Sequence, residues 1–221
     1  MSLLGPNLNR TFQSASATPR VDGDPLTHFG ARMRFGRDEE IFAQDEEADL
    51  VYQVLSGVVR TTHLTSDGRR HVGDFYYPGD FFGLESSEAH RFSAEALTDC
   101  EILVVRRSPM SRMADLDGAL QRLVWAATSR ELERTQEHLM LLGRRTACEK
   151  VASFLLDAAN RSGGEIIALP MGRQDMADYL GLTIETVSRM VTQLQADGLV
   201  RFLDCRHFKI TRRQVLEDML A

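Results

Sequence analysis

Four side chains with complementary chemistry share one face of a short predicted helix: Ile184, Glu185, Ser188 and Arg189. At about 100° per residue they point the same way. The opposite face is apolar, with Val187, Met190, Val191 and Leu194. A guanidinium can pair with guanine O6 and N7, a carboxylate can accept from cytosine N4, and an alkyl group can pack on a thymine methyl. The polar face therefore has the chemistry to read base edges in a DNA major groove.

The preceding residues have the spacing of a helix-turn-helix that would position this face. Ala177 is small, as two closely crossing helices require, and Gly181 comes four residues later, where the turn needs a positive φ. Val187 follows after six more residues and is expected to face inward. An ordinary amphipathic helix with a solvated Glu-Arg face is the alternative. The agreement of several small and apolar positions favours the helix-turn-helix.

Further DNA contacts are expected around this helix, from Thr183, Thr186, Arg173 and Arg206. The formal net charge of −6 at first argues against nucleic acid. However, residues 144–221 carry a net charge of +1, and the acidity lies in the part without the motif. Basic side chains there can contact phosphates locally, and a simply solvated surface is the alternative for them.

Composition and cysteine usage exclude several other classes. No apolar run approaches the roughly 20 residues that span a membrane, and the N-terminus lacks a secretion signal, so we expect a cytoplasmic protein with no membrane partner. The three cysteines, Cys100, Cys148 and Cys205, are widely spaced and form no CxxC pair. This pattern fits a reducing compartment, and it predicts no metal site or iron–sulfur cluster.

The chain divides into four predicted segments of an α+β fold. Residues 1–27 are expected to form a flexible N-terminal arm, and residues 28–108 an antiparallel β-roll or jelly-roll sensor domain with Gly-containing turns. Residues 109–142 are expected to form a long dimerisation helix, and residues 143–221 a winged helix-turn-helix domain.

The long predicted helix carries two apolar stripes. The early stripe comprises Leu116, Leu120, Leu123 and Ala127. The later stripe, expected to mediate dimerisation, comprises Leu132, Thr135, Leu139 and Leu142. Its 3-4-3 spacing is typical of a helix packed on a parallel copy of itself. The alternative is packing on the chain's own barrel, and both arrangements can hold in different halves of the helix.

Several segments resemble the CRP/FNR family of bacterial transcription regulators, and its FixK-like branch in particular. The segments are 66–70, 78–84, 141–145 and 169–189, the last of which contains LPMGRQDMADYLGLTIETVSR. The resemblance implies a homodimeric activator that binds double-stranded DNA at a TTGAT-N4-ATCAA-like inverted repeat and contacts RNA polymerase. It also implies a role in a low-oxygen or nitrogen-metabolism cascade, with Glu185, Ser188 and Arg189 as the base-reading residues.

The residues that hold an effector in relatives are altered here, which predicts a regulator without a cofactor or small-molecule effector. No cysteine occurs in the first 99 residues, where an iron–sulfur relative carries its cluster ligands. In the cyclic-nucleotide branch an Arg directly precedes Ser/Thr, but here Phe92 separates Arg91 from Ser93. None of the six histidines has a recognisable haem-ligand context. The alternative is a member gated by haem, a nucleotide or another small molecule.

Cys205 lies on the predicted wing beside Arg206, where it is a candidate redox-sensitive residue. A neighbouring guanidinium can lower a thiol pKa, and oxidation would place negative charge close to DNA phosphate. An inert wing cysteine is the alternative.

Two other classes of protein are disfavoured. A cupin-type enzyme needs clustered metal ligands, but His63 and His71 lack a His-x-His pairing, so no enzymatic activity is expected. A protein-binding scaffold that has lost DNA reading conflicts with the intact set of Glu185, Ser188 and Arg189.

Overall fold

A computed structural model describes residues 30–108, 118–144, 146–162 and 164–220. The predicted arm 1–27, Leu116 and the predicted helix start at 109 lie outside these residues. Among the described helices, none is long and apolar enough to cross a membrane.

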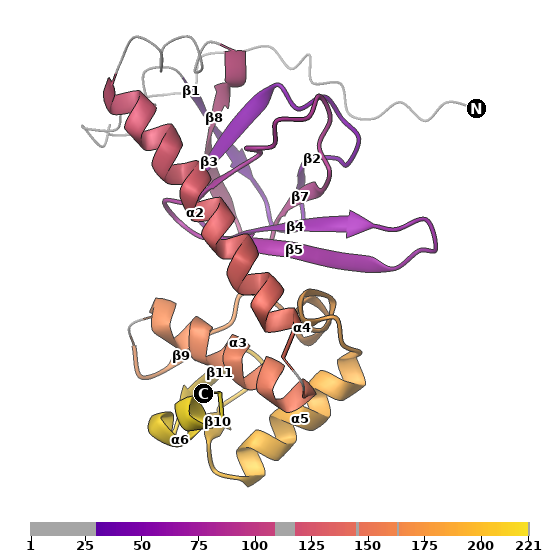
Figure 1. Ribbon diagram of the computed structural model, residues 1–221, viewed down its shortest axis with the longest axis vertical. Coiled ribbons are helices and arrows are strands. Elements are labelled where there is room, and N and C mark those ends of the chain that lie inside the picture. The colour runs from indigo at the N-terminus through magenta and orange to yellow at the C-terminus, as the bar shows by residue number, and fades with distance from the viewer. Residues whose placement is uncertain (1–29, 109–117, 145, 163, 221) are drawn as a thin grey trace.

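Eight strands form the N-terminal β-roll (Figure 1). They are β1 (Gly30–Phe35), β2 (Glu40–Phe42), β3 (Leu50–Ser56), β4 (Val59–Leu64), β5 (Arg70–Tyr76), β6 (Phe81–Phe82), β7 (Ser93–Ala96) and β8 (Cys100–Arg106). They pair antiparallel in two four-stranded sheets, of order β1-β8-β3-β6 and β2-β7-β4-β5. The predicted fold class is therefore confirmed.

Aromatic rings fill part of the space between the two sheets. The rings of Phe42 and His90 stack with centroids 3.7 Å apart, and those of Tyr52 and Phe82 stack at 5.0 Å. His90 is only 1% exposed, and its Nδ1 lies 3.1 Å from Glu85 Oε1. Burial alone raises the pKa of Glu85, but its hydrogen bonds and the nearby charges of His90 and Arg107 together lower that pKa. The interior of the β-roll is thus packed by its own side chains.

Helix α2 (Gly118–Leu142) runs along the β-roll (Figure 1). Its two predicted stripes differ in burial. Leu120 is buried, and Leu123 and Val124 pack beside it against the β-roll core. Leu132 and Leu139 are instead 59% and 69% exposed. The two stripes therefore face different surroundings in the two halves of the helix, as the sequence allowed.

Arg134 joins the middle of α2 to the β-roll. Its Nε donates to Asp74 Oδ2 at 2.8 Å, its Nη1 lies 3.0 Å from Asp80 Oδ2, and its Nη2 donates to the Phe75 carbonyl at 2.6 Å. Burial alone lowers the pKa of Arg134, but the two carboxylates raise it above its ordinary value. The ion cluster thus keeps a buried guanidinium charged.

A second polar contact strengthens the same attachment. The Arg134 guanidinium carbon lies over the Tyr76 ring, 4.5 Å from the centroid of that ring. The Tyr76 hydroxyl donates to Glu131 Oε1 at 2.8 Å. Burial raises the pKa of Tyr76 and also that of Glu131. One turn of α2 is therefore bound to β5 by both charge and aromatic contact.

The C-terminal domain is a winged helix-turn-helix. Its elements are α3 (Ala147–Ser162), β9 (Ile167–Ala168), α4 (Arg173–Leu180), α5 (Ile184–Ala196), β10 (Val200–Phe202), β11 (His207–Ile210) and α6 (Arg213–Asp218). The three strands form one antiparallel sheet of order β10-β11-β9. The hairpin β10-β11 is the predicted wing.

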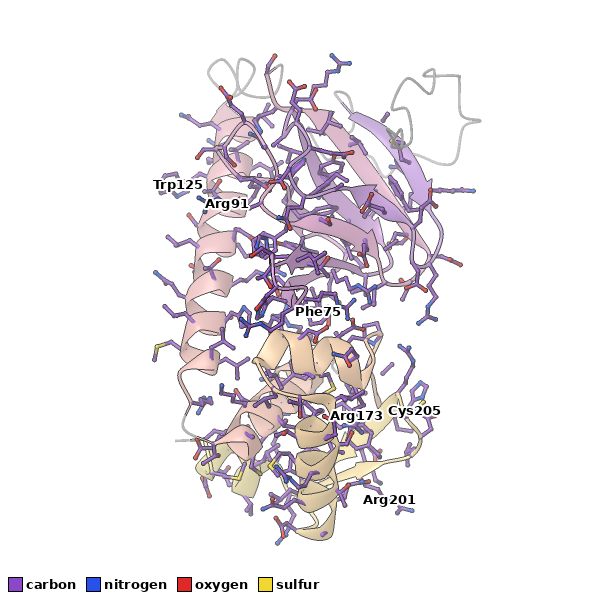
Figure 2. All side chains as sticks on the ribbon, turned by 90° about the vertical axis from the view of Figure 1, so that its right-hand side faces the viewer. Phe75, Arg91, Trp125, Arg173, Arg201 and Cys205 are labelled. Carbon is purple, nitrogen blue, oxygen red and sulfur yellow. The ribbon has the colours of Figure 1, made fainter. Side chains whose placement is uncertain are left out.

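The core of this domain continues into the β-roll. Phe75 of β5 packs against Phe154 of α3 and Tyr179 of α4, with ring centroids 6.2 and 5.3 Å apart (Figure 2). His138 of α2 stacks on Tyr179 at 4.0 Å and bonds to its carbonyl through Nε2 at 2.8 Å. The β-roll, α2 and the C-terminal domain therefore meet in one apolar cluster.

Arg134→Gln should lower the free energy of unfolding by about 3–5 kcal/mol, because it leaves two largely buried carboxylates without their counter-charge. Urea unfolding followed by circular dichroism, at one protein concentration, measures the loss. Arg130→Gln removes an exposed arginine from the same helix and should change stability by less than about 0.5 kcal/mol. Equal stabilities of the two variants would contradict the role of Arg134.

Candidate nucleic-acid interface

The turn between α4 and α5 has the geometry that the sequence predicts. Ala177 and Val187 are completely buried where the two helices pack. Gly181 ends α4 in the left-handed region at φ 63°, and its N–H donates to the Ala177 carbonyl. A glycine adopts this conformation without the steric cost of a Cβ. Local residue types therefore determine how α5 leaves α4.

Helix α5 exposes the predicted base-reading face. Thr183 caps its first turn, with Oγ1 accepting from the Thr186 N–H at 3.2 Å. Val187, Val191 and Leu194 are buried against the domain core. The opposite face, with Ile184, Glu185, Ser188 and Arg189, is exposed.

The two charged side chains of this face differ in how the protein holds them. Hydrogen bonds from the Glu185 backbone and the Thr183 side chain lower the pKa of Glu185, so its carboxylate stays ionised as an acceptor. Arg189 makes no hydrogen bond or ion pair with any residue that the structure describes. Its five donors are therefore available to a ligand.

Arg206, also predicted to contact DNA, is used within the domain. Its Nη1 donates to the Pro170 carbonyl, and its backbone N–H donates to Asp204 Oδ1 at 2.7 Å. The same Asp204 oxygen accepts from the His207 N–H at 2.7 Å. These bonds shape the tip of the wing and fasten it to the chain before α4. Arg206 thus holds the wing in place.

Arg173 begins α4 and lies against the wing (Figure 2). Its guanidinium stacks over the Phe202 ring at 4.4 Å. Burial lowers the pKa of Arg173, while the nearby Cys205 thiol acts in the opposite direction. Its Nη1 is buried and has no hydrogen-bond partner among the described residues. Arg173 therefore lies beside the interface with its guanidinium packed against the wing.

The remaining basic residues separate into two groups. Arg212 donates to the carbonyls of Asp197 and Gly198, and Arg213 pairs with Glu217. Arg201 on β10 is exposed and, within the described parts of the chain, makes no hydrogen bond or ion pair. Arg189 and Arg201 are thus exposed guanidinium groups without a protein partner among the described residues, a distinction that the sequence does not reveal.

Domain profiles match both halves of the chain. The Crp-like helix-turn-helix domain matches residues 149–219, and the cyclic nucleotide-binding domain matches residues 32–117. The nitrogen fixation regulation protein FixK of Azorhizobium caulinodans is 48% identical over 196 residues, which cover 86% of this chain and 79% of that protein.

The chain belongs to the CRP/FNR family of transcription regulators, in its FixK branch. The FixK protein of Rhizobium meliloti is 43% identical and covers 81% of this chain and 82% of its own length. The structure of FixK2 from Bradyrhizobium japonicum superposes with a TM-score of 0.81 at 45% identity, covering 87% of this chain and 98% of that one. These relatives are regulators of transcription and not enzymes.

In this FixK-branch chain the four residues predicted to mediate dimerisation form one exposed stripe of α2, here called the seam. Leu132, Thr135, Leu139 and Leu142 are all exposed. The exposed stripe is longer than the one predicted from the sequence, because Thr128 and Trp125 continue the 3-4 spacing towards the N-terminus. Trp125 is 74% exposed and projects away from the β-roll (Figure 2).

The segment Arg91 to Ser93 corresponds to the nucleotide-binding motif of the cyclic-nucleotide branch. Here its residues make contacts within the β-roll. Arg91 is exposed, and its carbonyl bonds to His63 Nδ1 at 2.9 Å. Phe92 lies so close to Gly73 that a Cβ there would come within 2.7 Å of its ring. Ser93 Oγ accepts from the Gln44 N–H at 2.9 Å. The inserted Phe92 therefore separates Arg91 from a serine that is already bonded.

The redox hypothesis for Cys205 remains a prediction. Its thiol is exposed on the wing, so peroxide can reach it and add negative charge near bound phosphate. We expect peroxide to weaken DNA binding by the wild type but not by Cys205→Ser, measured by equilibrium binding. Cys148→Ser, which changes a half-buried thiol on α3, is the control and should retain the wild-type response. Equal sensitivity of Cys205→Ser and the wild type would contradict the hypothesis.

Proposed function

We propose that this chain is a homodimeric transcription activator that binds a TTGAT-N4-ATCAA-like inverted repeat without a small-molecule effector. The observation that carries the proposal is the exposed face of α5. Glu185 and Ser188 are exposed there, and Arg189 has no protein partner among the described residues. An unengaged Arg and an ionised Glu on a capped helix can form bidentate and acceptor contacts with base edges.

The dimer is supported by the exposed stripe of α2. Leu132 and Leu139 lie one heptad apart with large exposed apolar surfaces, and Trp125 precedes them by one more heptad. Packing two copies along this stripe would remove that surface from water and relate the recognition helices by a two-fold axis. Two such helices suit half-sites about one helical turn of DNA apart.

An effector-free mode is supported by the packing of the β-roll. Stacked rings fill part of its interior, and Arg134 already connects it to α2 through Asp74 and Asp80. The match to the cyclic nucleotide-binding domain supports the alternative, a ligand-gated regulator. The two functions differ in whether the purified protein binds its site without additions.

The names of the relatives suggest the regulated processes. Two FixK proteins that resemble this chain carry the description of nitrogen fixation regulation. We place this chain in a low-oxygen or nitrogen-metabolism cascade, where it would contact RNA polymerase at promoters that carry the inverted repeat.

Arg189→Ala should weaken specific binding by about 1–3 kcal/mol and relax discrimination at one guanine of each half-site, because a bidentate contact is lost. Equilibrium binding to duplexes substituted at each position measures this effect. Arg201→Ala is the matched control: an exposed wing arginine that contacts phosphate should weaken specific and scrambled duplexes equally. If Arg189→Ala also weakened both duplexes equally, the base-reading role would be wrong.

Leu139→Glu should convert the dimer into a monomer, because it places two like charges within the proposed seam. Sedimentation equilibrium measures the mass. Met140→Glu is the matched control: Met140 is 75% exposed on the same helix but lies about 100° away from the seam, so this variant should stay dimeric. An unchanged mass for Leu139→Glu would refute the proposed interface.

A further inference from the structure

Two carboxylates on α4, those of Asp175 and Asp178, face the β-roll. Asp175 is 6% exposed as a residue, and the Asp178 side chain is 11% exposed. Arg60 of β4 donates through Nη1 to Asp175 Oδ1 at 2.9 Å. Arg70 of β5 donates through Nη2 to the same oxygen at 2.9 Å and through Nε to Asp178 Oδ2 at 2.8 Å. These four side chains form the junction cluster.

The junction cluster is anchored firmly at both ends. On the β-roll, Arg60 also donates through Nη2 and Nε to Glu95 Oε2, at 2.6 and 2.9 Å. On α4, the second oxygen of Asp175 accepts from the Gly172 N–H at 3.2 Å, at the N-cap of the helix. One carboxylate therefore fixes the start of α4 and binds two strands of the β-roll. Any rotation of α4 away from the roll would break several charge-assisted bonds at once.

The covalent link between the domains is too short to carry much structure of its own. Helix α2 ends at Leu142 and α3 begins at Ala147. Noncovalent contacts also hold the C-terminal domain against the β-roll, among them the junction cluster and the packing of Phe75 on Tyr179. Moving α4 away from the roll would break the charge-assisted bonds of this cluster together.

Helix α5 moves with α4, because the Gly181 turn and the buried Ala177 and Val187 pack the two helices as a unit. We propose that the junction cluster of Arg60, Arg70, Asp175 and Asp178 sets the angle of the recognition helix to the dimer axis, and so selects the spacer length between half-sites. This inference rests on the proposed function, since spacer length has meaning only for a dimer on an inverted repeat. It assigns a specificity role to residues that touch no base.

Full-length protein should be titrated with duplexes whose two half-sites are separated by shorter, equal or longer spacers than N4, and with a duplex that carries one half-site. The wild type should prefer one spacer. Arg70→Ala and Asp178→Asn should each reduce that preference by about tenfold, within the coupling range for contacting residues. Binding to the single half-site should stay unchanged, because the face of α5 is intact, and this also reports that the variant is folded.

The double variant should lose no more than Arg70→Ala alone, because removing Arg70 already removes its bonds to both Asp178 and Asp175. Arg69→Ala breaks an ion pair with Asp67 on the same hairpin, where the Arg69 side chain is 74% exposed, and it should keep the wild-type preference. An unchanged spacer preference in Arg70→Ala and Asp178→Asn would overturn the inference alone. A wild type that binds no spaced duplex better than a scrambled one would overturn the proposed function and this inference with it.

Discussion

Helix α2 must satisfy two neighbours at once, and the rest of the structure depends on how it does so. One face is bound to its own β-roll, through Leu120 at one end and the buried Arg134 in the middle. The adjacent face presents Leu132 and Leu139 to solvent. If α2 were free to rotate about its axis, it could not keep one face on the β-roll and the other exposed. The Arg134 ion cluster fixes that rotation, and so determines which stripe of α2 is left exposed.

The same logic extends from α2 to the DNA-binding domain. His138 of α2 stacks on Tyr179 of α4, and Phe75 of the β-roll packs against the same ring. Beside them Arg60 and Arg70 pair with α4. The orientation of α5 is therefore supported from both the helix and the roll.

Much of the interface was predictable because its determinants are local. Ala177, Gly181 and Val187 lie within one short segment, so residue type and spacing alone predict the turn and the exposed face. The same holds for the wing and for the seam stripe.

The contacts that orient these local units were not predictable. Arg60 and Asp175 are separated by 115 residues and Arg134 and Asp74 by 60, and neither pair has a local signature. The sequence also could not show which arginines the protein uses internally. Arg206 donates to the Pro170 carbonyl, whereas Arg189 makes no hydrogen bond or ion pair with the residues that the structure describes. Such distinctions depend on tertiary packing, which residue spacing does not encode.

We expect the β-roll, α2 and the winged helix-turn-helix to bind DNA together without a ligand. Equilibrium binding of the purified, reduced, full-length protein to a TTGAT-N4-ATCAA duplex and to a scrambled duplex, at one salt concentration and with no added ligand, tests this expectation. The inverted repeat should bind tighter by about 10³-fold or more, as specific sites generally do. Equal binding of the two duplexes would show that the protein alone does not recognise this site.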